Sequence, residues 1–295
     1  MSRRSLATAA IALIVLAVGI RAHADLLVRT DTSVARFDEV SGAFLGAFAH
    51  GVVGVGLTFG HEGHLYISDE VNGNVQRFNG HTGVFLGIFA FGIDTPRFLI
   101  FGPDGNLYVS SLFTASIVRF NGNTGAPLGT FATAPGLFPE GLVFGPDGNL
   151  YVSDESNGIV LRFNGTTGAL IGTFASGPEL SFPAGLVFGP DGNLYVASGG
   201  NNEVIRYNGT TGAPIGTFAS GGGLNTPFGL VFGPDGNLYV SSEFSNEVIR
   251  YNGTTGALIG TFASGPHLSF PAGLTFSRPR GRSPITHLPR ITPEH

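Results

Sequence analysis

Short runs of apolar and aromatic residues alternate with turn residues along most of the chain. Between Gly141 and Phe174 the apolar runs are GLVF, LYVS, VLRF and LIGTF, and branched or aromatic side chains dominate them. Such runs, bounded by Gly, Pro, Asn and Asp, predict β-strands. The breaks at 146–149 and 164–168 predict tight turns, because Pro pre-sets φ and Gly adopts the left-handed conformation. This stretch is therefore expected to form four short antiparallel strands.

The same pattern occurs six times. An Arg-aromatic pair marks each copy, at Arg36-Phe37, Arg77-Phe78, Arg119-Phe120, Arg162-Phe163, Arg206-Tyr207 and Arg250-Tyr251, with spacings of 41, 42, 43, 44 and 44 residues. Four strands in about 40 to 45 residues is the period of a β-propeller, and no single unit could bury both of its faces. We therefore expect an all-β fold, a six-bladed β-propeller of four-stranded antiparallel blades.

The two ends of the repeat region complement each other. The first predicted strand, Leu26-Leu27-Val28, is of the second-strand type, and Gly273-Leu274-Thr275-Phe276 is a seventh copy of the first strand. Pairing these two segments would close the ring with one blade built from both ends, and would remove the exposed edges of an open array. Residues 25–277 are therefore assigned to the propeller.

The repeats resemble NHL repeats. That family's pattern joins a first strand preceded by Pro and Gly, an Asp-Gly turn, a Leu-Tyr-Val strand and a strand that ends in Arg-Phe. The resemblance runs from Asp25 to about Phe276. It implies a propeller, and it leaves the function open because the family includes interaction platforms, RNA binders and enzymes such as lyases. The chain has no Trp, whereas WD-type propellers carry a Trp-Asp dipeptide in each blade.

The segments outside the repeats predict export. Arg3 and Arg4 precede an apolar run, and Ala22-His23-Ala24 has the small-x-small pattern that signal peptidase accepts. We expect residues 1–24 to be a signal peptide cleaved near Ala24-Asp25, because the run of about 15 apolar residues is shorter than the roughly 20 of a membrane span. The mature chain should then have no transmembrane anchor and be secreted or periplasmic. The Arg- and Pro-rich residues 278–295 are expected to be disordered.

Charge narrows the choice of partner. Three of the 15 basic residues leave with the signal peptide and none of the 20 acidic ones do, so 12 remain against 20, a net charge of about −8. An acidic chain argues against nucleic acid, whose binding needs a basic face. The chain has no Cys, so it contains neither disulfides nor thiolate ligands. We expect a monomer that binds a protein or a small extracellular ligand.

Alternation of strand direction places the loops after the second and fourth strands together on one face, here named the mouth face. Phe98, Phe113, Phe138, Phe182, Phe228, Phe244 and Phe270 lie in or beside those loops. They either anchor the loops or form an apolar contact surface. The residue that opens each innermost strand reads Val55, Arg97, Glu140, Ala184, Phe228 and Ala272 around the ring. Arg97 and Glu140 come from adjacent blades and either form an ion pair or orient a polar ligand.

Two further groups are candidates for metal ions. The mouth-face loops carry Asp69, Glu70 and Asn72, and Asp154, Glu155 and Asn157. These are oxygen donors of the kind that holds Ca²⁺, and they are also ordinary turn caps. His61, His64 and His81 replace turn residues of one blade on the opposite face, where they could bind zinc or be solvated. No further cofactor is predicted.

Two functional hypotheses follow. The first is an extracytoplasmic binding or protein-interaction module that uses the mouth face. The second is a propeller hydrolase or lyase that works at the channel mouth with Glu140, Arg97 and a metal held by Asp69, Asp154 or their neighbours. The near-identity of the last three repeats leaves little asymmetry from which to build a catalytic site, so we favour binding. A channel filled by side chains would favour the module, and converging carboxylates or His in the channel would favour the enzyme.

Overall fold

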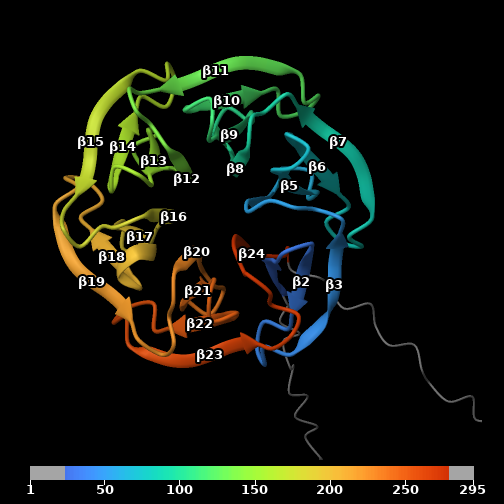
Figure 1. Cartoon of the computed structure of the whole chain (residues 1–295), viewed down its shortest axis with the longest axis vertical. Coiled ribbons are helices and arrows are strands. Elements are labelled where there is room, and N and C mark those ends of the chain that lie inside the picture. The colour runs from blue at the N-terminus through green and yellow to red at the C-terminus, as the bar shows by residue number, and fades with distance from the viewer. Residues whose placement is uncertain (1–23, 279–295) are drawn as a thin grey trace, which may run out of the picture.

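The computed structural model describes residues 24–278. The predicted signal peptide, apart from Ala24, and the tail beyond Arg278 lie outside the described residues. Six four-stranded sheets are arranged around a central axis, as Figure 1 shows. This confirms the predicted all-β, six-bladed propeller.

The first two blades in the chain are β24(Leu274–Phe276), β1(Leu26–Arg29), β2(Ser33–Phe37), β3(Phe44–His50), and β4(Leu57–Phe59), β5(Leu65–Asp69), β6(Asn74–Phe78), β7(Phe85–Phe91). The next two are β8(Pro96–Phe101), β9(Leu107–Ser111), β10(Ser116–Phe120), β11(Pro127–Thr133), and β12(Pro139–Phe144), β13(Leu150–Asp154), β14(Ile159–Phe163), β15(Leu170–Ser176). The last two are β16(Pro183–Phe188), β17(Leu194–Ser198), β18(Glu203–Tyr207), β19(Pro214–Ser220), and β20(Pro227–Phe232), β21(Leu238–Ser242), β22(Glu247–Tyr251), β23(Leu258–Ser264). A short 3-10 helix, η1(Gly199–Asn201), follows β17.

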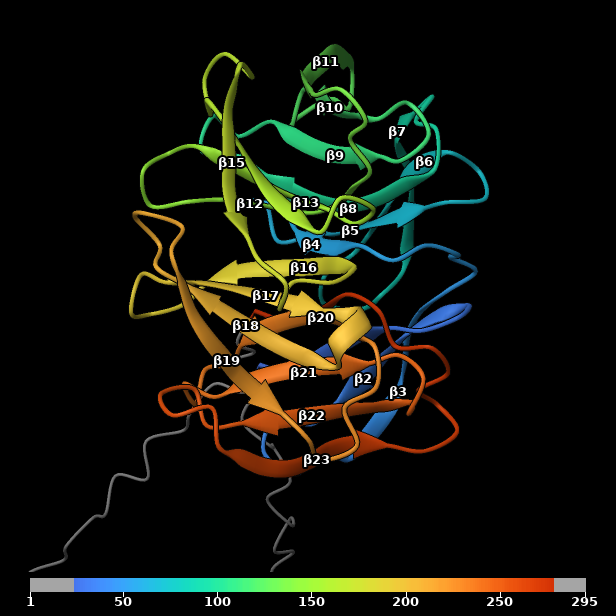
Figure 2. The same cartoon turned by 60° about the vertical axis from the view of Figure 1, so that its left-hand side comes forward.

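Within a blade the strands run from the axis to the rim in chain order, as β20, β21, β22 and β23 do in Figure 2. One blade joins the two ends of the repeat region. Its inner strand β24 pairs with β1 in the register Leu26↔Phe276 and Val28↔Leu274, so the predicted closure of the ring is confirmed. Among residues 24–278 no helix has the length and apolar character that a bilayer crossing requires.

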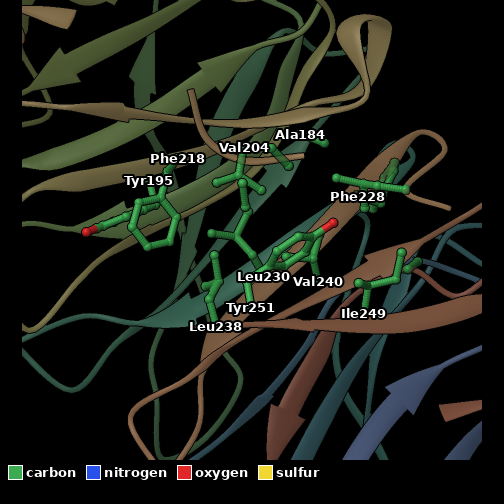
Figure 3. Close-up of a cluster of buried hydrophobic side chains, with 14 residues drawn as sticks. Ala184, Tyr195, Val204, Phe218, Phe228, Leu230, Leu238, Val240, Ile249 and Tyr251 are labelled. Carbon is green, nitrogen blue, oxygen red and sulfur yellow. The ribbon is translucent and has the colours of Figure 1, made fainter. Parts of the chain in front are cut away.

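The core lies between neighbouring blades. The Tyr151 ring from β13 contacts Phe174 of its own blade at 4.7 Å and Phe188 of the next blade at 5.1 Å, both edge to face. The same three-ring contact occurs at Tyr66, Tyr108, Tyr195 and Tyr239. Figure 3 shows one of these interfaces, where Tyr195 and Phe218 meet Leu230 and Leu238 of the following blade. These aromatic contacts hold the ring together.

The face opposite the mouth, here named the turn face, repeats one polar network. The Tyr151 hydroxyl donates to Asp147 Oδ2 over 2.9 Å, and the Asn149 amide donates to the same oxygen over 2.7 Å. The guanidinium of Arg162 lies 5.5 Å from the centre of the Phe174 ring. The corresponding Asp–Asn–Tyr bonds recur at Asp104, Asp191 and Asp235. The turn face is therefore built largely from side chains that recur at the same positions of the repeats.

Candidate functional site

Arg97, the second residue of the inner strand β8, pairs with two carboxylates at the channel mouth. Its Nε donates to Glu140 Oε1 over 3.0 Å and to Oε2 over 2.8 Å. Its Nη1 donates to Oε1 of Glu70, from the loop after β5. The residues of three successive blades thus form an ion-paired triad, which is the first of the two arrangements expected for Arg97 and Glu140.

Burial sets the electrostatics of this triad. Glu140 has no exposed surface, and desolvation raises the pKa of its carboxyl, against the lowering effect of Arg97 and with small additions from Glu155 and Glu70, to about 7. Desolvation lowers the pKa of Arg97, but Glu140 and Glu70 together raise it above its ordinary value. Arg97 therefore stays protonated, and Glu140 is the group that titrates.

Two aromatic rings fill the channel beneath Arg97. Phe98 of β8 and Phe228 of β20 come from opposite blades, and their rings stack with centroids 5.6 Å apart and an interplanar angle of 18°. The guanidinium of Arg97 lies 5.7 Å from the Phe228 centroid, within the range of a cation–π contact. Phe228 packs in a buried cluster with Ala184 and Ala272, which face the same channel. Side chains of the described residues 24–278 thus meet across the channel at this level.

Phe98 stands where every other blade has Gly. The corresponding residues are Gly56, Gly141, Gly185, Gly229 and Gly273. A Cβ on Gly185 would lie 2.6 Å from the Phe228 carbonyl oxygen, so the close approach of the inner strands explains the repeated Gly. The exception at Phe98 was visible in the repeat alignment, and it marks the residue that closes the channel with Phe228.

A cavity of about 390 Å³ opens above this aromatic pair on the mouth face. Its walls include Arg29, Glu70, Arg97, Phe228, Glu243 and Phe270. Three of these residues were predicted as site residues, namely Glu70, Arg97 and Phe228. Glu243 and Phe270 complete the walls from mouth-face loops, where Phe270 was expected as a loop anchor or part of a contact surface, and Arg29 was not predicted.

Arg29 also differs from the residue that the other repeats carry at its position. Its position at the end of β1 corresponds to Ser68, Ser110, Ser153 and Ser241 in other blades. Arg29 is 1% exposed, and it donates to the carbonyl oxygens of Ser33 and Asp31 over 3.3 and 3.1 Å. Burial lowers its pKa to about 10, although Asp31, Glu70 and Asp69 act in the opposite direction. An Arg in a Ser position was the sequence signal that would have located this wall of the cavity.

Glu243 is a half-buried carboxylate in the loop after β21. Among residues 24–278 no side chain hydrogen-bonds to its carboxylate or lies within ion-pair distance of it. Burial raises its pKa, Arg97 lowers it, and the like charge of Glu155 raises it again. The charge of Glu155 also raises the pKa of Glu140. Glu155 therefore lies near both Glu140 and Glu243 at the mouth.

The predicted Ca²⁺ donors are largely used within their own loops. Asp69 accepts from the backbone and side-chain amides of Asn72 over 3.0 and 2.9 Å and from Gln76 over 2.6 Å. Asp154 accepts from Asn157 in the same manner, at 3.3 and 2.9 Å. These bonds are those of turn caps. In the described part of the chain no three His, Cys, Asp or Glu side chains are grouped so that they could hold a metal ion.

The remaining predicted residues lie on the surface. Phe113 is 71% exposed, and Phe244 is exposed with its ring edge-to-face against Phe270 at 6.1 Å. On the turn face, His61 lies 5.8 Å from Phe101, and its carbonyl oxygen accepts from Arg278. His64 and His81 lie in the two turns of the same blade. Ca²⁺ at the mouth loops and zinc at these histidines stay predictions.

No protein-family model matches the chain, and no curated protein matches its sequence. Its fold is similar to those of solved structures at low sequence identity. A chain of a nidogen–laminin complex has a TM-score of 0.74 at 19% identity, over 88% of this chain and 100% of that chain. A Bacteroides caccae protein of unknown function has a TM-score of 0.70 at 13% identity, over 87% and 99% of the two chains. Virginiamycin B lyase from Staphylococcus aureus has a TM-score of 0.60 at 20% identity, over 76% of each chain. These likenesses show the six-bladed propeller fold, and the NHL resemblance stays a prediction.

Proposed function

We propose that this protein is an exported binding module that takes a protein or a small extracellular ligand at its mouth face. One observation carries the proposal. Four of the six blades repeat one polar network on the turn face, whereas at the mouth the corresponding positions differ in chemistry, and Arg97, Phe228 and their neighbours surround a cavity. Residues that repeat serve the fold, so chemistry that does not repeat is available for recognition.

The filled channel supports binding over catalysis. Phe98 and Phe228 stack across it, so a ligand would meet a shallow cavity with an apolar floor. The mouth-face residues Phe113 and Phe244 are exposed, as expected for a contact surface. The nidogen–laminin structure is a complex of proteins, which gives a precedent for a similar propeller in protein association.

A hydrolase or lyase, metal-assisted or not, is the second candidate. The favouring observation is Glu140, because its pKa of about 7 suits a general acid or base at neutral pH. However, Glu140 is fully buried and both of its oxygens accept from Arg97 Nε. A substrate would have to displace Arg97 before it could reach this carboxyl.

Site-specific photo-crosslinking tests the binding proposal. Benzoylphenylalanine would replace Phe113 or Phe244 on the mouth face, or Phe85 on the outer strand β7, where the side chain is also exposed. Irradiation in the extracellular fraction of the source organism should give a discrete crosslinked product from the two mouth positions and none from Phe85. Equal products from all three positions, or none, would contradict the proposal. If the bound partner is a small molecule, its chemical conversion by the wild-type protein and not by Glu140→Gln would favour the enzyme.

A further inference from the structure

The two faces of the ring carry different charge. On the turn face the frame arginines lie close to carboxylates, with Nη1 to Oδ2 distances of 3.8 to 3.9 Å in the pairs Arg119–Asp104, Arg206–Asp191 and Arg250–Asp235. The mouth-face loops and connectors carry Asp31, Glu70, Asp94, Glu155, Glu179 and Glu243. Among residues 24–278 the arginines on that face are Arg29, which is buried, and Arg97, which is paired. The accessible charge at the mouth is therefore negative.

Glu243 is a mouth carboxylate that makes no hydrogen bond or ion pair within residues 24–278, although Arg97 acts on it over a longer distance. It lines the cavity together with Phe228 and Phe270, and in residues 24–278 it has no ion-pair partner. A half-buried carboxylate without a counter-ion is electrostatically costly, and a cation placed beside it would offset that cost. The wall holds three carboxylates, Asp31, Glu70 and Glu243, against two arginines, Arg29 and Arg97, so its net charge favours a positive group.

The aromatic residues favour an organic cation on an apolar carrier. Phe228 already receives one guanidinium, that of Arg97, and exposed Phe244 and Phe270 form an edge-to-face pair at the rim. Aromatic faces attract ammonium and guanidinium groups. Phe138 and Phe182 are also exposed on the mouth face, in the connectors that precede β12 and β16, beyond what a small ligand in the cavity would contact. A protein segment can reach both the cavity and this rim.

Building on the proposed function, we infer that the partner is a protein segment that inserts an Arg or Lys side chain into the cavity beside Glu243. Apolar residues that flank this basic residue pack on Phe244 and Phe270. The acidic loops around the mouth attract such a segment and repel an acidic one. The occupant is thus a basic side chain of a partner protein, with a free small cation or an acidic peptide as outcomes that would argue against it.

Selection from a displayed library of random 12-residue peptides tests this inference on the purified chain beginning at Asp25. Peptides that bind should share an Arg or Lys next to apolar residues. Replacing that Arg by citrulline, or that Lys by acetyl-lysine, keeps the shape and removes the charge, and should weaken binding at least about tenfold. Glu243→Gln should reduce the affinity for the charged peptide by a similar factor and the affinity for the neutral peptide only slightly. The four affinities form a double-mutant cycle.

Glu247→Gln is the matched control, because Glu247 begins β22 in the same blade and is not part of the cavity wall. It removes the same charge and should leave the affinity unchanged. Thermal unfolding of both variants checks that they are folded. Peptides whose binding is lost in Phe244→Ser but is indifferent to citrulline or to Glu243→Gln would overturn the inference and leave the proposed function standing. Peptides that bind Phe244→Ser as well as wild type, or no selected peptides, would count against both.

Discussion

On the turn face four of the six blades repeat the same Asp, Asn and Tyr contacts, whereas on the mouth face neighbouring blades present Arg97, Glu140, Ala184 and Phe228 at one equivalent position. The same strands build both faces, so the difference does not come from the fold. It shows which side chains stabilise the ring and which are free to vary. The repeated face should control stability, and the varied face should control binding.

The pKa values of three carboxyl groups on the turn face and two at the mouth shift in opposite directions. Burial acts to raise the pKa of Asp147 on the turn face, but hydrogen bonds from Asn149 and Tyr151 outweigh it, and the pKa is lowered. Asp104 and Asp191 behave alike. At the mouth, burial dominates and the pKa values of Glu140 and Glu243 are raised. Lowering the pH should therefore remove the stabilising hydrogen bonds of the ionised aspartates on the turn face. At the mouth it should remove the cost of burying the charges of Glu140 and Glu243.

The largest expected difference between the faces is in packing. Tyr151→Ala removes a ring that is 1% exposed and contacts two phenylalanines, so the free energy of unfolding should fall by about 3 to 5 kcal/mol. Phe113→Ala on the mouth face should change it by less than about 0.5 kcal/mol, because that ring is exposed. Urea unfolding of both variants measures the contrast. Equal losses would show that the mouth face carries stability as well.

Much of this contrast was predictable from the sequence. The six-fold spacing of Arg-aromatic pairs predicted the blades, and the orphan strands at the two ends predicted their pairing, because a repeat reports its own register. The mouth was harder. Arg97 and Glu140 could be placed in adjacent blades, but the contact with Glu70 depends on how far a loop side chain reaches. The stack of Phe98 on Phe228 joins opposite blades; the repeats show that Phe98 replaces a Gly, but they do not show which residue its ring contacts.

The pH dependence of stability sharpens the comparison at Glu140. Because its pKa in the folded protein lies above the ordinary 4.5, at about 7, the folded chain holds a proton that the unfolded chain releases. The contribution of the Glu140 carboxyl to the free energy of unfolding is complete below about pH 4.5 and is lost as the pH rises through 7. Wild type should therefore gain stability relative to Glu140→Gln between pH 8 and pH 5, by about 2 to 3 kcal/mol.

Urea unfolding of wild type and Glu140→Gln at several pH values between 5 and 8 measures this difference. The variant cannot titrate at this position, so subtracting its curve removes the contributions of all other groups. A difference that stays constant would show that Arg97 keeps Glu140 ionised throughout the range. Below pH 4 both proteins should lose stability together, because the turn-face aspartates with lowered pKa values then become protonated.

The smallest effect tests whether the frame and the mouth are independent. In β13 the Ser153 hydroxyl accepts from Gly141 N over 2.8 Å and donates to the Ala184 carbonyl of the next blade over 2.6 Å. The corresponding residue of β17 is Ala197, which is buried. Ala197→Ser would place a hydroxyl by the Phe228 carbonyl and should add about 1 kcal/mol of stability in urea unfolding, and Ser153→Ala should lose about as much or more.

Ala197 lies in the blade that directly precedes Phe228, so this added bond would join two blades beneath the mouth. If recognition depends only on the side chains around the cavity, Ala197→Ser should bind a selected mouth peptide with unchanged affinity while it unfolds at higher urea. If affinity falls as stability rises, the inner strands must move apart for the partner to enter, and the division between a stabilising face and a binding face would not hold at this blade.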